Sequence, residues 1–377
     1  GISQLPGAHY LEFSAGVLKT KRWYDFPSKI GELKVSVSEK EIKRTYLELL
    51  LESIRLRFRA DVEVGFNISG GVDSSLLLAL VNKHQDSKNI KAYTFYTGDR
   101  RYDELPWVEK MIKQTGNPLV KVKFSKTEVE KYAGKISGFQ DEPFGGIPTL
   151  AYAKIFERAK EQGVRVLLDG QGMDEQWAGY DYYTTHTESP IQGIGKSASF
   201  KPNVLQEDFR NLAEKPGYPQ PFSNRLQNLQ YRDLFYTKIP RALRFNDRIS
   251  MAFSTELREP FLDYRLIELA FSLPEKFKIR NGTSKFLLRE ITKEFIPGNI
   301  STAPKRPLQT PQREWLGGEL KDFANDQISG LEKGIFKEYF DHQQIEKEWR
   351  DYKNGKMENS FFIWQWINMN LLQENIG

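Results

Sequence analysis

A strand, a glycine turn and the start of a helix follow one another between residues 62 and 81, and this succession constrains the fold more than any other stretch. The apolar run 62–68 leads directly into residues 69–75, which read Ser-Gly-Gly-Val-Asp-Ser-Ser, and an apolar stretch continues over 76–81. Glycines let backbone N–H groups approach a phosphate without a Cβ in the way, and serine hydroxyls add donors. Because a helix N-terminus attracts anions, the stretch predicts a phosphate-binding loop. A tight strand-to-helix turn without a ligand is the alternative.

The loop also contains an aspartate, Asp73, which would repel a phosphate unless a cation lay between them. This aspartate therefore predicts Mg²⁺. The ordinary nucleotide loop, G-x-x-x-x-G-K-[ST], is not formed around Gly195-Lys196-Ser197, because position 190 is proline and no strand precedes it. The loop at 69–75 instead resembles the pyrophosphate loop of enzymes that split ATP into AMP and pyrophosphate.

Strand and helix patterns alternate from residue 62 to residue 170. Candidate strands cover 62–68, 91–97, 119–124 and 164–169, and helical segments lie around 74–86, 103–115, 126–137 and 148–162. This alternation predicts an α/β fold, a parallel sheet with helices on both faces. Ligands of such sheets bind beyond the carboxyl ends of the strands, where the loops 69–75 and 170–175 are expected.

The 377 residues exceed the usual size of a single core, so a division is expected. We expect an extended lead-in at 1–37, an α/β core at 38–183 and an irregular excursion at 184–228, which is rich in Pro, Gly, Ser and Asn. A mainly helical part at 229–377 would complete the active site.

Composition excludes several classes of chemistry. The chain has no cysteine, so disulfides, thiolate metal sites and a cysteine nucleophile are excluded. Its four histidines form no metal-ligand pattern, which disfavours a histidine-driven hydrolase. The net charge of +5 is too small to distinguish nucleotides from nucleic acid as partners. No apolar run is long enough to span a bilayer and no signal pattern is present, so a cytoplasmic location is expected.

Three further blocks carry polar side chains in informative patterns. Residues 168–180 contain a Gly-x-Gly followed by Asp174 and Glu175 at a helix start, and Asp174 could bind Mg²⁺ with Asp73 or act only as a helix cap. Residues 248–263 follow a basic helix face at 241, 244 and 248, for which a salt-bridged surface is the alternative reading. Lys285, and later Lys305 in a proline-bounded loop, could stabilise a pyrophosphate leaving group.

Together these blocks resemble the synthetase domain of the asparagine synthetase family. The resemblance runs from Arg22-Trp23-Tyr24 to the tryptophan-rich end, and 69–75, 169–180 and 248–263 are its specific parts. It implies an ATP-pyrophosphatase type of fold. It also implies a reaction in which a carboxylate attacks the α-phosphate of ATP, pyrophosphate leaves, and ammonia or an amine displaces AMP to form an amide.

The resemblance also implies a role for each matching position. Pyrophosphate would be held by Ser69, Gly70, Gly71, Asp73, Ser74 and Ser75. The adenosine site would be lined by Ile68, Thr97 and Gly170. Mg²⁺ would be bound by Asp73 and Asp174. Among the catalytic residues, Glu256 matches a glutamate that supports the base in β-lactam-forming relatives, Arg258 would orient Glu256 or substrate, and Lys305 matches a lysine that stabilises the transition states.

The chain departs from the family pattern in two places. Gln171 stands where asparagine synthetases carry a glutamate and the β-lactam-forming relatives a tyrosine, and an amide cannot act as a general base. It can orient ammonia or the acyl carbonyl, so a carboxylate other than aspartate, as in β-lactam synthetases or in natural-product or sugar-acid amidation, is an alternative substrate. The missing cysteine excludes the family's route of glutamine hydrolysis. The glutaminase domain would then be removed or be a separate subunit, or ammonia or an amine would be used directly.

Two functions of other classes remain open. An RNA-modifying enzyme with the same type of loop usually needs an RNA-binding appendage or a cysteine, and neither is evident. A non-catalytic nucleotide-binding subunit is the second alternative. We expect a small-molecule carboxylate and ammonia or an amine as partners, with a possible separate glutaminase subunit and with neither nucleic acid nor membrane. The patterns give no oligomeric state.

Overall fold

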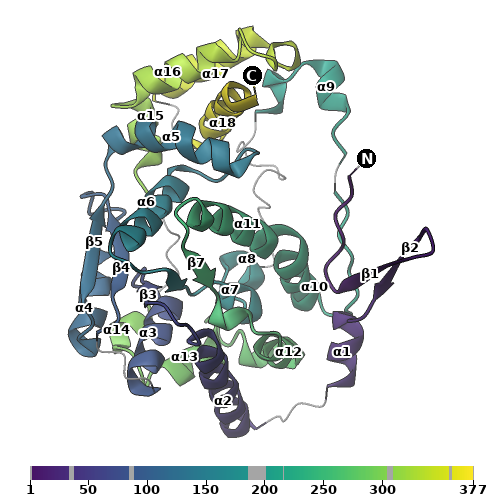
Figure 1. Cartoon of the computed structure of the whole chain (residues 1–377), viewed down its shortest axis with the longest axis vertical. Coiled ribbons are helices and arrows are strands. Elements are labelled where there is room, and N and C mark those ends of the chain that lie inside the picture. The colour runs from purple at the N-terminus through teal and green to yellow at the C-terminus, as the bar shows by residue number, and fades with distance from the viewer. Residues whose placement is uncertain are drawn as a thin grey trace.

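One parallel sheet organises the computed structural model, which describes residues 2–33, 38–84, 89–185, 201–214, 216–303, 309–355 and 359–376. Five strands are ordered β5-β4-β3-β6-β7 and all neighbours are parallel (Figure 1). Their bounds are β3 Val64–Asn67, β4 Ala92–Tyr96, β5 Leu119–Lys123, β6 Val166–Leu168 and β7 Glu256–Arg258. The parallel α/β fold predicted from the alternating pattern is confirmed.

The fifth strand was not predicted. β7 is three residues long and its register pairs Val166 with Glu256 and Leu168 with Arg258. So short a segment shows no alternation of its own, and its extended conformation depends on pairing with β6. Because β7 belongs to the part expected to be mainly helical, the α/β core and the C-terminal part share one sheet rather than forming separate units.

Helices cover both faces of the sheet, because each crossover between parallel strands must pass over a face. The connecting helices are α3 Val72–His84, α4 Leu105–Thr115, α5 Lys126–Gln140 and α6 Ile147–Glu161. On one face, α3 and α4 pack with α2 Glu39–Arg57, α12 Tyr264–Ser272 and α13 Phe286–Thr292 in one apolar cluster. On the other, α5 and α6 pack with the C-terminal helices in a second cluster. The fully buried residues 76–78 of α3 show why that helix is apolar all round.

The C-terminal part is otherwise helical, as expected. Its longer helices are α11 Lys238–Met251, α16 Lys321–Gly330, α17 His342–Lys353 and α18 Phe361–Ile376. Its shorter elements are η2 Asp233–Thr237, η3 Pro260–Leu262, η4 Glu275–Phe277, α14 Gly298–Ser301, α15 Gln312–Gly317 and η5 Lys337–Tyr339. The tryptophan-rich segment lies in α18, where Trp364 is completely buried against α5 and its neighbours. It is core packing.

The segment expected as an irregular excursion, 184–228, lies partly outside the described residues. Before it come the one-turn helices α7 Met173–Gln176 and α8 Asp181–Thr184. Its described residues include η1 Pro202–Val204, α9 Glu207–Asn211 and the start of α10 Arg225–Arg232.

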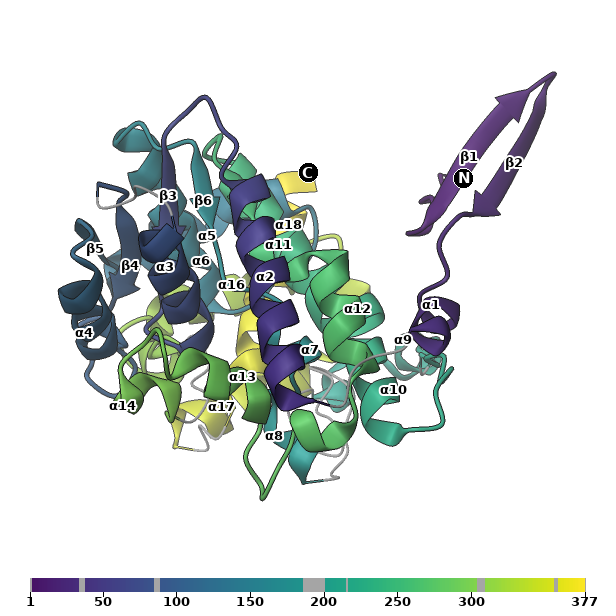
Figure 2. The ribbon, with the colours of Figure 1, turned by 90° about the horizontal axis from the view of Figure 1, so that it is seen from below.

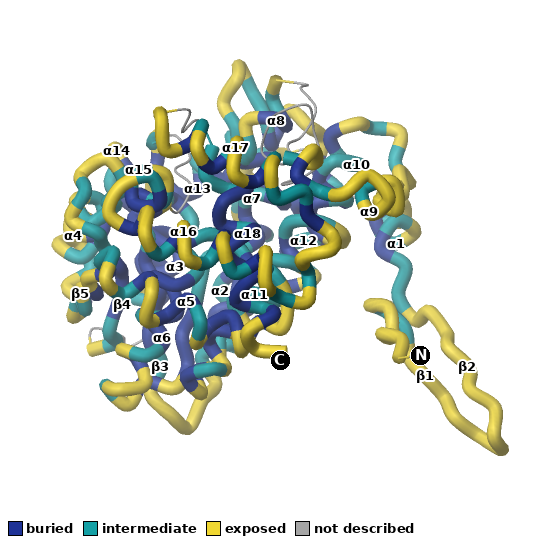
Figure 3. Tube along the Cα trace, turned by 90° about the horizontal axis from the view of Figure 1, so that it is seen from above, coloured by how far each residue is buried: buried dark blue, intermediate teal, exposed yellow. Residues whose placement is uncertain are grey.

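The N-terminal segment is a hairpin that projects from the rest of the molecule (Figure 2). Strands β1 His9–Ser14 and β2 Val17–Arg22 pair antiparallel, and α1 Phe26–Glu32 follows them. Nearly every hairpin residue is exposed, while the residues of the central sheet are mostly buried (Figure 3). Within the described ranges, no helix has both the length and the apolar character needed to cross a membrane.

Candidate active site

The loop after β3 has the geometry expected of an anion-binding turn. The side chain of Ser74 accepts a hydrogen bond from the backbone N–H of Ser69 at 3.2 Å, and the two serine hydroxyls lie 3.2 Å apart. Gly70 has a φ of +71°, and a Cβ there would lie 2.9 Å from Trp107 Cβ, so a glycine is required at this turn. The following residues begin α3, whose N-terminus faces the same loop.

A cavity of about 270 Å³ opens at the carboxyl ends of β3, β4 and β6. Most of the nucleotide residues predicted from the sequence line it: Ile68, Ser69, Gly70, Gly71, Asp73, Ser74, Gly170, Gln171 and Asp174. The fold brings these residues together because the carboxyl ends of parallel strands meet at one edge of the sheet. The roles that the resemblance gives them stay predictions.

Two aspartates from different strand ends converge on one buried lysine in this cavity. The Nζ of Lys285 lies 2.7 Å from both carboxylate oxygens of Asp73 and 2.7 Å from Oδ1 of Asp174. The Lys285 side chain is only 6% exposed. Burial alone would lower the pKa of Lys285, but the charges of Asp174 and Asp73 outweigh it and raise that pKa. Lys285 is therefore a permanent cation between two carboxylates.

Residue 179 must be a glycine, because a side chain there has no room beside this ion cluster. A Cβ at Gly179 would lie 2.0 Å from Oδ1 of Asp174 and 2.4 Å from Cε of Lys285. Arg289 lies one turn beyond Lys285 and donates to the carbonyls of Ser301 at 2.6 Å and Ala303 at 2.9 Å. Burial lowers the pKa of Arg289, and the nearby aspartates oppose this. The cavity thus has positive and negative groups in close contact.

The two aspartates fit the expected Mg²⁺. Two carboxylates directed at one point are a suitable donor set, since Mg²⁺ in nucleotide sites is bound by one or two carboxylates and by substrate phosphates. Among the described residues, no cluster of three or more His, Asp or Glu forms a ready metal site. The remaining metal ligands would therefore come from the nucleotide and from water. Lys285 lies against the same two carboxylates.

A second carboxylate pair lies at the same sheet edge, and no lysine or arginine among the described residues forms an ion pair with it. Tyr152 donates from its hydroxyl to Asp169, and Asn67 donates to that hydroxyl at 2.6 Å. Oε2 of Glu259 accepts from the backbone N–H of Gln171 at 3.2 Å. Oε1 of Glu259 is buried and has no hydrogen-bond partner in the described part of the chain.

The second pair holds a proton more tightly than ordinary carboxyl groups. Burial raises the pKa of Asp169, and burial together with the charge of Asp169 raises the pKa of Glu259 well above its usual range. The charge of Arg57 lowers the pKa of Glu259, but by less than burial and Asp169 raise it. Burial and neighbouring negative charge both disfavour the ionised forms, so these carboxyl groups bind a proton more tightly than exposed ones.

Several predicted site residues lie elsewhere. Glu256 is 58% exposed and pairs with Arg258 at 2.8 Å, and Arg258 also donates to the carbonyl of Arg57 at 2.6 Å. The structure therefore confirms contact between Glu256 and Arg258 but does not bring either into the cavity. Glu256 begins β7, whereas the cavity lies beyond the carboxyl end. Two intervening steps of about 3.3 Å per residue separate it from that end.

Two nucleotide residues from the prediction also do not line the cavity. Thr97 is held in the turn after β4, where its N–H and its hydroxyl both donate to Asp103, at 2.7 and 2.8 Å. Ser75 is completely buried inside the first turn of α3. Lys305 lies outside the described residues.

The basic helix face at 241, 244 and 248 is largely a salt-bridged surface. Arg244 pairs with Glu142 at 2.6 Å and Arg248 pairs with Asp141 at 2.6 Å, which ties α11 to the end of α5. The alternative reading of this face is thus the better one for these two arginines.

Three residues of the site were missed by sequence reasoning. Glu259 was passed over in favour of Glu256, although it directly follows the three residues that form β7. Asp169 is the last residue of the predicted strand 164–169 and directly follows the observed β6, and a carboxylate at that place was a readable signal. Tyr152 comes from α6, and the helical pattern gave no indication that its hydroxyl reaches Asp169.

A parallel sheet with a glycine- and serine-rich loop before α3, and carboxylates at the next strand end, defines an α/β protein of the ATP-pyrophosphatase type. The family described as Asparagine synthase matches residues 45–374, so the chain belongs to that family.

Relatives of known name agree with this membership. The chain is 24% identical to asparagine synthetase [glutamine-hydrolyzing] 1 of Bacillus subtilis, over 97% of this chain and 65% of that protein. It is 26% identical to a putative asparagine synthetase [glutamine-hydrolyzing] of Mycobacterium bovis, over 84% of this chain and 55% of that protein. It is 24% identical to amidase chyE of Penicillium rubens, over 85% of this chain and 60% of that protein. The chain spans less than two thirds of the length of each of these relatives.

Proposed function

We propose that the protein is an ATP-dependent, AMP-forming amide ligase. It would activate a small-molecule carboxylate as an acyl-adenylate, release pyrophosphate, and transfer the acyl group to ammonia or an amine. The observation that carries this proposal is the convergence of Asp73 and Asp174 on one cation, in a cavity formed beside the loop 69–71 and the start of α3. Family membership supports the same reaction class.

In the adenylation step, the chain would bind the triphosphate at its charged end. The loop N–H groups and serine hydroxyls would donate to the β- and γ-phosphates. Asp73 and Asp174 would hold Mg²⁺, which would neutralise phosphate charge when bound. Lys285 and Arg289, which line the cavity, would stabilise the negative charge that accumulates on the departing pyrophosphate. Lys305 stays a predicted contributor to this charge stabilisation.

In the amide-forming step, an amine that attacks the acyl carbon must lose a proton. Gln171 cannot accept that proton, because an amide is not a base at neutral pH. Asp169 lines the cavity, and burial raises its pKa and that of Glu259, so this pair would take up the proton while AMP leaves with the bonding electrons. The amide N–H₂ of Gln171, which bonds Asp169 in the structure, would turn to orient the acyl carbonyl.

The nitrogen source and the acid are part of the proposal. Two of the relatives carry the description glutamine-hydrolysing, but the present 377 residues contain no cysteine. We propose ammonia or a primary amine as the nucleophile at this site, supplied by diffusion, by a glutaminase domain outside the present residues or by a separate glutaminase subunit. Gln171 with a carboxyl pair behind it favours an acid other than aspartate, although aspartate is the first candidate to test.

An ATP–pyrophosphate exchange screen tests the proposal. Purified protein with Mg²⁺-ATP is incubated with labelled pyrophosphate and each of a panel of amino acids and other carboxylates, aspartate first. We expect label to enter ATP only with the activated acid, and ammonia or an amine to convert that acid to its amide with release of AMP. Release of ADP would refute the mechanism. Binding of ATP without exchange for any acid would favour a non-catalytic nucleotide-binding subunit.

A further inference from the structure

The one-turn helix α7 brings Asp174 and Glu175 into the cavity, and most of its backbone carbonyls need partners from elsewhere. The N–H groups of Trp177 and Gly179 satisfy the carbonyls of Met173 at 3.0 Å and Asp174 at 2.8 Å. The helix then ends, because Ala178 adopts a left-handed φ of 55°. The next carbonyls, those of Glu175 and Gln176, belong to buried residues with no continuing helix to bond them.

Gln230 of α10 supplies both missing donors. Its Nε2 lies 2.6 Å from the carbonyl oxygen of Glu175 and 2.8 Å from that of Gln176. The side chain is completely buried. A single amide N–H₂ thus caps the C-terminal end of α7 from a helix more than fifty residues away in the sequence. The carbonyl of Trp177 is bonded in turn by the N–H of Lys285, at 3.1 Å.

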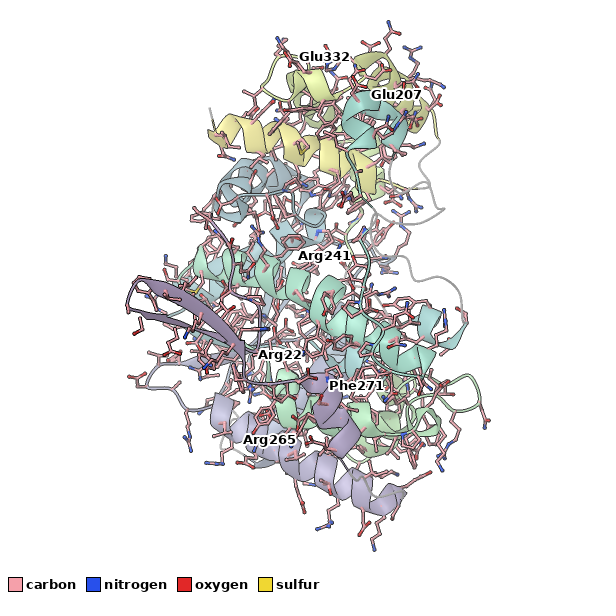
Figure 4. All side chains as sticks on the ribbon, turned by 90° about the vertical axis from the view of Figure 1, so that its right-hand side faces the viewer. Arg22, Glu207, Arg241, Arg265, Phe271 and Glu332 are labelled. Carbon is pink, nitrogen blue, oxygen red and sulfur yellow. The ribbon has the colours of Figure 1, made fainter. Side chains whose placement is uncertain are left out.

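Lys278 determines which way the Gln230 amide points. The Nζ of Lys278 donates to Oε1 of Gln230 at 3.0 Å and to the carbonyl of Phe271 at 3.3 Å (Phe271 is labelled in Figure 4). A lysine ammonium has donors only and a backbone carbonyl has acceptors only, so only one orientation of the amide satisfies both neighbours. Lys278 is 1% exposed, and burial lowers its pKa to about 7 against a smaller opposing effect of Glu275.

We propose that Gln230 and Lys278 are positioning residues for Asp174. Neither is among the described residues that line the cavity, and Gln230 reaches it through the carbonyls of α7. The Lys278 carbonyl also accepts a hydrogen bond from the N–H of Phe286, next to Lys285, at 2.9 Å. By fixing that turn, they hold the Asp174 carboxylate at the point where it meets Asp73 and Lys285. The inference deepens the proposed function, since it rests on Asp174 as a ligand of Mg²⁺ on ATP. It does not depend on which acid is activated.

The test is ATP binding measured by calorimetry at graded Mg²⁺ concentrations, without any acid. For Gln230→Met we expect the Mg²⁺ concentration for half-maximal ATP binding to rise by roughly 10–100-fold, as for other losses of groups that orient metal ligands. Gln227→Met is the matched control, because Gln227 lies on the same helix and its Nε2 bonds the same Phe271 carbonyl at 3.2 Å without reaching α7. We expect that control to keep the wild-type Mg²⁺ requirement.

A second variant, studied with its melting curve, tests the same two donors. Gln230→Glu keeps the size of the side chain and pairs with Lys278, but it replaces the two donors to α7 by an acceptor. Its oxygen faces two carbonyl oxygens, so we expect a lower melting temperature, and in the fraction that melting curves show to be folded we expect the Mg²⁺ requirement to rise as in Gln230→Met. An unchanged Mg²⁺ requirement in a folded Gln230 variant would overturn the inference and leave Gln230 a structural residue. Absence of pyrophosphate exchange in a wild-type protein that binds Mg²⁺-ATP would instead overturn only the proposed function.

Discussion

Two carboxylate pairs lie at the same edge of the sheet, and within the described part of the chain only the first forms an ion pair with a lysine. Asp73 and Asp174 are bridged by Lys285 at 2.7 Å, whereas Asp169 and Glu259 are surrounded by a tyrosine hydroxyl and backbone N–H groups. Lys285 supplies a positive charge beside the first pair. The carboxyl groups of the second pair have pKa values raised by burial. The neighbouring charge, and not the carboxyl group, decides which chemistry each pair can perform.

Replacement of the lysine is expected to have the largest effect. Lys285→Met leaves two buried carboxylates without their cation, and breaking such a buried ionic contact costs about 3–5 kcal/mol of unfolding free energy. Urea unfolding at neutral pH measures this loss. As a control, Lys293→Met removes a half-exposed pair with Glu290 and is expected to change stability by less than about 0.5 kcal/mol. Equal effects of the two substitutions would mean that the first pair is not held by Lys285.

The second prediction concerns the function of the bridged pair. Asp174→Asn keeps the shape of the side chain but removes one metal-binding charge, so pyrophosphate exchange should fall by about 10²–10³-fold. The melting temperature, measured in parallel, separates this loss from unfolding. If exchange persists at the wild-type rate in a folded Asp174→Asn protein, Asp174 is not a metal ligand.

The first carboxylate pair could be predicted from the sequence, whereas the second could not. Asp73 and Asp174 were predicted because each follows a glycine turn after an apolar strand, and parallel strands place such turns side by side. The bridging role of Lys285 was not predicted, since an ion contact between residues more than two hundred positions apart leaves no local pattern. The first pair therefore follows from local signals and fold class, while its protonation state requires the three-dimensional structure.

The second carboxylate pair was not predicted, because β7 is too short to show a strand pattern in the sequence. Residues 256–258 are extended only because β6 pairs with them, so nothing local shows that Glu256 starts the strand and Glu259 follows its end. Glu256 and Glu259 are only three residues apart, but the first lies at the exposed start of β7 and the second lies at the site. The other four strands, by contrast, lie within longer segments whose sequence pattern predicted them.

A third prediction separates the two pairs by reaction step. Asp169→Asn removes the proton acceptor that lines the cavity, and amide formation should fall by about 10²-fold while acid-dependent pyrophosphate exchange continues. The two rates are measured on the same preparation, with amide formation followed by AMP release in ammonia. Asp322→Asn, an exposed change on α16, serves as the control. An equal fall in exchange and amide formation would place Asp169 in nucleotide binding instead.

The smallest effect is a difference in the pH dependence of stability. Glu259 and Asp169 have folded pKa values above those of the unfolded chain, so the folded protein binds more protons than the unfolded one above about pH 4. Their contribution is therefore fully present below the unfolded pKa and is lost as pH rises, by at most about 1.4 kcal/mol per pH unit for each proton.

Glu259→Gln removes one raised group, and without that neighbouring carboxylate the pKa of Asp169 should fall. Unfolding free energies from urea titrations between pH 4.5 and 6.5 should thus decline less steeply with pH in the variant than in the wild type. This window lies below the pKa of about 7 for Lys278, whose lowered value acts with the opposite sign, adding stability as pH rises from about 7 towards the unfolded lysine value near 10.4. Groups outside the pair cancel in the difference between the two proteins. Parallel slopes would show that the second pair is ionised like an ordinary surface pair, and the contrast between the two pairs would then be lost.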